Sequence, residues 1–113
     1  MESQTEINEE RKRVLEKIRQ LSPEVMKFVA AQGDTAYKDG ALSTKVKRLI
    51  ALAIGLRAGC TNCIVAQTQR SLEAGATVEE IMETIGVEIC MSGTTGVGES
   101  LRVIKFLEEL GKI

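Results

Sequence analysis

The sequence predicts an all-α fold of about six helices in a single domain over residues 1–113. Apolar residues recur at helical spacing along most of the chain, and no stretch shows the alternation of a β-strand. Glycines and capping residues divide the chain into segments of ordinary helix length. A chain of this size forms one domain with a limited core.

The first two helices are expected to meet at the only proline, Pro23. Residues 6–21 place a thin apolar stripe on one helical face, so we expect a charged N-terminal helix within residues 1–22 that packs on a neighbouring helix or subunit. Ser22 is a favoured N-cap, and proline is favoured at the first helical position. The second helix is therefore predicted from Pro23 to about Tyr37.

The third and fourth helices are predicted on either side of Gly59. Residues 44–58 follow a predicted cap at Ser43 and are mostly apolar, which is typical of a central helix. Glycine after a helical run ends the helix, and Cys60 opens the next one. We expect this fourth helix to continue to Ala74.

Two more helices complete the predicted fold. Thr77 and Glu80 match a capping box, so the fifth helix starts there and runs to about Met91. The glycine-rich stretch 92–98 is predicted to be a turn into a last helix that ends near Leu110. No strand precedes this stretch and no Gly-Lys-Ser/Thr follows it, so its glycines indicate close helix packing and not a nucleotide-binding loop.

The composition narrows the classes of function. The 16 acidic and 15 basic side chains give a net charge of −1, so neither nucleic acid nor a membrane is expected as a partner. No apolar run reaches the ~18 residues of a membrane span, and a cytoplasmic location is the expectation. The core must be mainly aliphatic, because Phe28, Tyr37 and Phe106 are the only aromatic residues. Oligomerisation would add buried surface to such a small core.

The most informative motif is Cys60-Thr61-Asn62-Cys63, in a chain that has no histidine. Two thiols at this spacing can close a disulfide, and a helix N-terminus stabilises the thiolate that attacks disulfides and peroxides. A zinc site would need two more ligands, and Cys90 is the only other cysteine, so no metal or cofactor is expected. Two inert core cysteines remain the alternative.

The roles of the two sulfurs stay open at the level of sequence. The start of the helix favours Cys60 as the attacking thiol, by dipole and exposure. Gln67, one turn beyond Cys63, can form hydrogen bonds but cannot take a proton. Arg48 and Arg57 would stabilise a thiolate if they pointed inward, although such arginines are more often solvated.

Two residues of the fifth helix are expected to have the burial that is usual for their type. Cys90 lies in an apolar stretch and is predicted to be a small buried core residue. Glu88, in the same stretch, is expected to be an exposed carboxylate, the more frequent case for a helix.

Three segments in order resemble the AhpD-like alkylhydroperoxidase and carboxymuconolactone decarboxylase superfamily. They are the apolar helix at 49–53, the C-x-x-C segment at 59–64 and the Gly-Ala-Thr-x-Glu-Glu-Ile segment at 75–81, within a match over about 42–110. The resemblance implies a helical fold that assembles into trimers or hexamers. In the redox branch, a dithiol cycles with a disulfide and reduces peroxides or the disulfide of a partner peroxidase, with electrons from a lipoyl-bearing protein.

The chain departs from the family pattern at all three proton-handling positions. The resemblance implies a glutamate where this chain has Arg48, a histidine where it has Gln67, and often a second histidine at Asn62. Cys60 and Cys63 carry over as the redox pair, with Cys63 as the thiol that the relay would assist. Thiolate would then have to be stabilised by the helix dipole and cationic neighbours, and Arg48 is the candidate.

These observations favour a thiol–disulfide oxidoreductase or peroxide-linked antioxidant protein that uses a Cys60/Cys63 couple without the usual relay. A peroxide or a disulfide-bearing protein would be its substrate. The first alternative is a non-enzymatic or redox-sensing oligomer of the same fold. The second is an enzyme of the decarboxylase branch, which generally lacks the C-x-x-C and would require a catalytic histidine.

Overall fold

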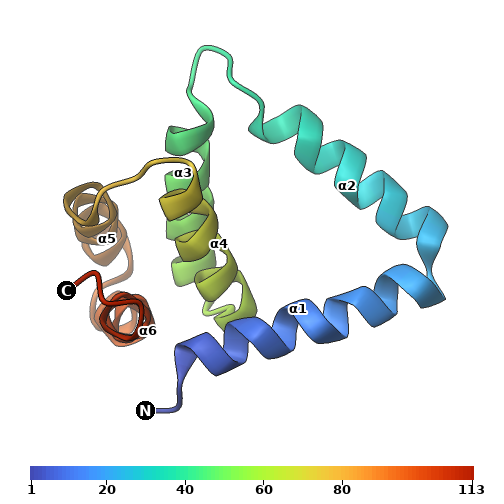
Figure 1. Cartoon of the computed structure of the whole chain (residues 1–113). Helices are drawn as coiled ribbons and strands as arrows, with labels where there is room; N and C mark the ends of the chain where they lie inside the picture. The colour runs from blue at the N-terminus through green and yellow to red at the C-terminus, as the bar shows by residue number, and fades with distance from the viewer.

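A computed structural model describes residues 1–113 and contains six helices and no strand, which confirms the all-α prediction (Figure 1). The helices are α1 (Gln4–Leu21), α2 (Pro23–Tyr37), α3 (Thr44–Ala58), α4 (Thr61–Glu73), α5 (Val78–Ser92) and α6 (Thr94–Glu109). None of them combines the length and hydropathy that a bilayer-spanning segment needs. Helices α3 to α6 pack together as the body of the molecule, and α1 and α2 extend from it as an arm (Figure 1).

The predicted caps of α3 and α5 form where the sequence placed them, whereas Ser22 precedes α2 as expected but makes no capping hydrogen bond with its side chain. The Ser43 hydroxyl accepts a hydrogen bond from the Val46 amide, and α3 ends at Gly59, whose φ of 67° is left-handed. The capping box of α5 is complete, because Thr77 and Glu80 each accept a hydrogen bond from the other's backbone amide. Glycine at the left-handed position and reciprocal capping are both local signals, which is why these boundaries can be read from the sequence.

The body encloses an aliphatic core. Its buried cluster consists of side chains from α3, α4, α5, α6 and the turn before α5: Leu52, Leu56, Ile64, Ala76, Ile81, Ile85, Val103 and Leu107. Helix α3 packs against α4, α5 and α6, in agreement with its predicted central position. Its outer face is nevertheless uncovered, with 63% of Ile54 exposed.

The predicted turn over residues 92–98 is wrong. Only Gly93, with a φ of 64°, separates α5 from α6, and Thr94 already belongs to α6. The expected close helix packing is found at Gly96, where a Cβ would lie 2.8 Å from Oε2 of Glu88 and 3.1 Å from Cα of Ile89. Gly96 is therefore a contact point between two helices and does not form a turn.

The predictions for Cys90 and Glu88 are also wrong. Helix α5 buries Ile81, Ile85 and Glu88, which follow one another at helical spacing on a single face. Cys90 lies off that face and is exposed. Glu88 is only 3% exposed, and neither of its carboxyl oxygens has a hydrogen-bond partner. The apolar residues of α5 fix which face of the helix turns to the core. Glu88 lies on that face and is buried despite its charge, whereas Cys90 lies off it and is exposed.

The unpartnered carboxyl group of Glu88 leads to a prediction about the stability of the protein. Glu88→Leu should raise the free energy of unfolding by about 1–3 kcal/mol, because burying an unsatisfied polar group is costly and an apolar side chain fits the same site. Urea denaturation at a fixed protein concentration measures this change. Glu83→Leu, at an exposed position of the same helix, should change it by less than about 0.5 kcal/mol. A destabilised Glu88→Leu protein would show that the carboxyl group has a partner in solution.

The arm is held to the body at its two ends. At the start of α1, the Glu109 carboxylate accepts hydrogen bonds from the backbone amides of Gln4, at 2.7 Å, and Thr5. A hydrogen bond from the Ser3 hydroxyl, together with these amides, lowers the pKa of Glu109. At the end of α2, the carbonyl of Tyr37 accepts a hydrogen bond from the Thr44 hydroxyl at 2.7 Å. Helix α2 itself buries none of its residues.

Candidate active site

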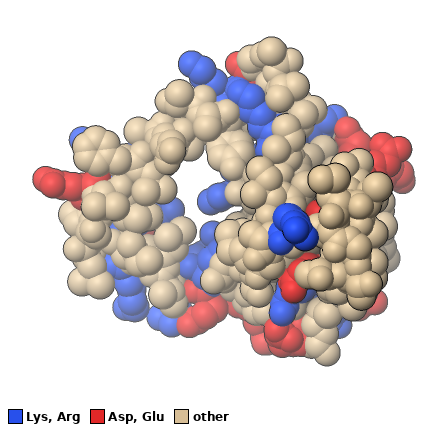
Figure 2. Space-filling view, turned by 180° about the vertical axis from the view of Figure 1, so that it is seen from behind, with Lys and Arg blue, Asp and Glu red and all other residues tan.

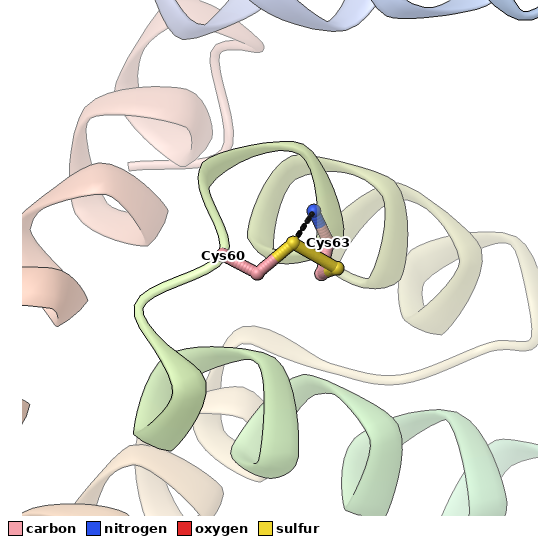
Figure 3. Close-up of a disulfide and its surroundings, with 2 residues drawn as sticks. All are labelled: Cys60 and Cys63. Carbon is pink, nitrogen blue, oxygen red and sulfur yellow. Dashed lines mark hydrogen bonds between the residues drawn. A yellow bond between two sulfur atoms is a disulfide. The ribbon is translucent and has the colours of Figure 1, made fainter.

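The two cysteines of the C-x-x-C motif form a disulfide at the start of α4 (Figure 3). Their Cα atoms are 5.1 Å apart, within the usual range for a disulfide. Cys60 is the N-cap of α4, and its sulfur accepts a hydrogen bond from the backbone amide of Cys63 at 3.2 Å. A thiolate at Cys60 would therefore be stabilised by a helix amide and by the helix dipole.

The exposure of the two cysteines differs from the expectation. Cys63 is exposed, whereas Cys60 is only partly exposed in the connection between α3 and α4. Gly55 brings the two helices together here, because a Cβ at Gly55 would lie 3.2 Å from Cβ of Cys63. The backbone amide of Cys60 also donates to the carbonyl of Gly55 at 3.1 Å. The first contact packs Cβ of Cys63 against α3, and the second holds the backbone of Cys60 at the end of α3. Cys63 is nevertheless the more exposed residue of the pair.

Cys63 lines a large hollow between the arm and the body. The hollow has a volume of about 910 Å³, and Figure 2 shows an opening there with basic side chains at its edge. Its apolar lining comes mainly from α1 and α2: Val14, Leu15, Ile18, Met26, Val29, Ala30 and Ala36. Its polar lining on α3 and α4 includes Arg48, Asn62, Gln67 and Arg70. Cys63 thus borders a space lined by apolar side chains of the arm and by arginines of α1, α3 and α4.

The three residues at the altered relay positions all lie on this hollow with Cys63. The guanidinium of Arg48 donates a hydrogen bond from Nη1 to Oε1 of Gln67 at 3.3 Å. It also stacks 3.5 Å from the centre of the Tyr37 ring. Burial, followed by the charge of Arg70, lowers the pKa of Arg48. Arg48 is therefore a fixed, half-buried cation.

Arg48 and Arg57 behave differently, although the sequence suggested that both would be solvated. Arg57 is exposed and does not line the hollow, so the surface interpretation holds for it. Arg48 departs from that interpretation because Tyr37, at the end of the arm, covers it. The stacking depends on how α2 returns to α3, which is a tertiary feature.

Three cationic residues of the hollow were missed from the sequence: Arg11 and Arg19 on α1, and Arg70 on α4. Arg70 lies seven residues after Cys63, two helical turns along the same face, so helical spacing could have identified it. No local signal could have placed the two arginines of α1, because their position depends on how α1 crosses α4.

The chemistry available at this site is that of a dithiol beside cations. Asp34 is the only acidic side chain that lines the hollow, and it comes from α2. No group of three or more Cys, Asp or Glu side chains is arranged to hold a metal ion. The site can therefore form and break a disulfide, and it can stabilise an anion electrostatically. It presents no side chain suited to general base catalysis next to Cys63.

The fold and the disulfide define a class of small helical proteins with a C-x-x-C at the start of a central helix. Residues 23–106 match the model of the carboxymuconolactone decarboxylase family, and the chain belongs to that family. The match confirms the superfamily that the sequence motifs indicated. It begins at α2, upstream of the segment 42–110 in which those motifs lie.

Solved structures of the family share this architecture. A carboxymuconolactone decarboxylase family protein of Legionella pneumophila is 32% identical, with a TM-score of 0.90 over 96% of this chain and 97% of that one. A family protein of Thermotoga maritima is 28% identical, with a TM-score of 0.77 over 91% and 87% of the two chains. An uncharacterized protein of Cupriavidus necator is 30% identical over 80% of each chain. The fold is therefore that of the family over nearly the whole chain.

Proposed function

We propose that this protein is a thiol–disulfide oxidoreductase that reduces a hydroperoxide or a disulfide with the Cys60/Cys63 couple. The observation that carries the proposal is the asymmetry of the disulfide. Cys63 is exposed and lines the hollow, whereas the sulfur of Cys60 accepts a hydrogen bond from a helix amide. One cysteine is thus accessible to a substrate, and the other is a stabilised leaving group.

The asymmetry assigns a role to each sulfur. The Cys63 thiolate attacks the distal oxygen of a hydroperoxide, the O–O bond breaks, and an alkoxide leaves that takes a proton to become the alcohol. The resulting sulfenic acid of Cys63 is attacked by the Cys60 thiolate, which forms the disulfide and releases water after protonation. Two electrons pass from the dithiol to the peroxide. An external dithiol returns them in two steps: its first thiolate attacks Cys63 and displaces Cys60 as a thiolate, and its second thiolate breaks this mixed disulfide, which releases Cys63 and leaves the external pair as a disulfide.

The cationic surroundings replace only part of a proton relay. Arg48 stabilises negative charge on Cys63 or on the leaving oxygen, but a guanidinium does not give up its proton at neutral pH. Water must therefore protonate the alkoxide. General acid–base assistance is worth about 10²–10⁴-fold, so we expect slow peroxide reduction and more efficient thiol–disulfide exchange.

Two further features support the proposal. The Thermotoga maritima relative is described as "possibly involved in antioxidative response". The arm and the outer face of α3 also leave large apolar side chains uncovered, with Phe28 77% and Ile54 63% exposed. We expect these faces to be covered in a homo-oligomer, a trimer or hexamer. An exposed free thiol at Cys90 and a reversible pair are consistent with the reducing cytoplasm.

A redox titration tests the function. The native protein is equilibrated in dithiol/disulfide buffers, and wild type is compared with Cys60→Ser and Cys63→Ser, with Cys90→Ser as the matched control. We expect a reversible two-electron couple in wild type and Cys90→Ser, and none in the other two variants. Reduced Cys60→Ser should still react with a disulfide reagent at Cys63 faster than a free cysteine does.

Two results would favour the alternative functions. Thiols that react no faster than free cysteine and form no disulfide would reject the oxidoreductase in favour of a structural or sensing role. Turnover of a carboxylated lactone that survives loss of both cysteines would instead place the protein in the decarboxylase branch.

A further inference from the structure

We propose that the hollow beside Cys63 binds an amphipathic organic anion, and that the peroxide or disulfide reduced by this protein carries such a group. The reactive part of this inference rests on the proposed function, whereas the anion site rests on the arrangement of arginines in the hollow. An anionic head group would lie among Arg11, Arg48 and Arg70, and its apolar body would lie against the arm.

The arginines of the hollow lack anionic partners. Arg11, Arg48 and Arg70 form no ion pair, although the molecule contains seven others. Arg19 pairs only with Glu16, one turn away on the exposed side of its own helix. Unpaired guanidinium groups that converge on one space are a common means of recognising carboxylates and phosphates.

Neutral groups hold two of these arginines in place. Arg11 donates from Nε and Nη2 to Oδ1 of Asn8 at 3.1 and 2.9 Å, and the amide of Asn8 donates in turn to Gln69. Arg48 donates to Gln67 and stacks on Tyr37. These contacts position the guanidinium groups without neutralising them. Their charge therefore remains available to a ligand.

The arginines repel one another across the hollow. Burial, followed by the charges of Arg70 and Arg19, lowers the pKa of Arg11, and burial followed by Arg70 lowers that of Arg48. Three carboxylates are close enough to compete for this charge. Asp34 lines the hollow, Glu73 lines a smaller pocket that shares Arg11 and Arg70, and the charges of Glu9 and Glu73 act to raise the pKa of Arg11. None of the three forms an ion pair with the arginines of the hollow. An anion bound between the arginines would relieve the repulsion.

The shape of the hollow indicates the rest of the ligand. Its volume of about 910 Å³ is in the range of sites for small organic molecules. The wall formed by the arm carries apolar side chains beside Arg11 and Arg19, including Ile18, Met26 and Val29. An inorganic anion would leave this wall in contact with water. A molecule with an apolar body and an anionic group would cover both walls.

Reaction rates with charged disulfide reagents test the substrate class. The reduced protein is mixed with dithiodipropionate, which is anionic, with hydroxyethyl disulfide, which is neutral, and with cystamine, which is cationic. Relative to a free neutral thiol, we expect Cys63 to favour the anionic reagent by on the order of tenfold, and this preference should decrease as salt is added. Arg70→Gln and Arg11→Gln should each weaken it, whereas Arg57→Gln, outside the hollow, should not. Equal preference in wild type and Arg70→Gln would overturn the proposal.

Binding to the oxidised protein separates the anion site from the redox function. Hexanoate is titrated into the ¹⁵N-labelled oxidised protein, and the Nε–Hε signals of Arg11, Arg48 and Arg70 are followed, with hexylammonium as the control. We expect saturable shifts with hexanoate only. Saturable binding in a protein that transfers no electrons would support the anion site and reject the proposed function. Electron transfer to the neutral disulfide without hexanoate binding would retain the function and overturn this inference.

A hollow filled by a second copy of the chain is the competing arrangement. The same arginine signals would then change with protein concentration and would not respond to hexanoate. That result would also overturn the proposal.

Discussion

Replacing Arg48 by glutamate together with Gln67 by histidine is expected to accelerate hydroperoxide reduction by about 10²–10⁴-fold. The resemblance to the redox branch implies an acidic residue and a histidine at these two positions. In this structure, Arg48 and Gln67 are already hydrogen-bonded to each other and share the hollow with Cys63. A histidine at position 67 would lie one helical turn from Cys63, and a glutamate at position 48 could orient it.

Single-turnover oxidation of the reduced protein by an organic hydroperoxide measures this effect. The double variant should also acquire a rate dependence near the ordinary histidine pKa of about 6.5. The matched control is Arg57→Glu with Gln20→His, which makes the same changes at exposed positions outside the hollow. A double variant no faster than either single variant would show that the two positions do not act as a relay in this chain.

Truncating Phe106 to alanine is expected to lower the free energy of unfolding by about 3–5 kcal/mol. Phe106 is 2% exposed and is the largest of the fully buried side chains, in a core that is otherwise aliphatic. Small aliphatic neighbours fixed on packed helices cannot close the space that a phenyl ring leaves. The cost should therefore include a cavity contribution as well as the lost burial.

Urea denaturation of the oxidised protein at one concentration provides the measurement for Phe106. The control is Phe28→Ala, because Phe28 is 77% exposed on α2 and its truncation should cost less than about 0.5 kcal/mol in the monomer. Similar losses in the two variants would mean that the position of Phe106 in the core is not as described. A loss at Phe28 that grows with protein concentration would instead reveal a subunit interface at α2.

The parts of the fold that the sequence predicted are those with local signals. Ser43, Gly59 and Thr77 mark helix ends through their own side chains or backbone angles, and the structure has these ends at the expected residues. The stretch 92–98 was mispredicted because glycine has two uses that look identical in sequence. Gly93 turns the chain, whereas Gly96 lets α6 approach α5.

The candidate site also has a part that local sequence signals predict and a part that they do not. Cys60, Cys63 and Gln67 lie on one helix start, so their proximity follows from spacing alone. The contact of Arg48 with Gln67 follows from the packing of α3 on α4, and the family resemblance indicated only that both are altered relay positions. The exposure of Cys63 and the arginines of α1 could not be predicted, because both depend on where the arm crosses the body.

The arm has a consequence for how the hollow opens. Because α2 buries no residue, its local unfolding exposes little apolar surface. We therefore expect a low free energy of local unfolding for this helix. The disulfide lies at the start of α4, which packs closely on α3 at Gly55. For these two helices we expect a high free energy of local unfolding. One wall of the hollow can therefore detach and return while the reactive wall keeps its shape. A ligand would be admitted by fluctuation of the arm, which would free Arg48 from its stacking on Tyr37 while the disulfide keeps its place.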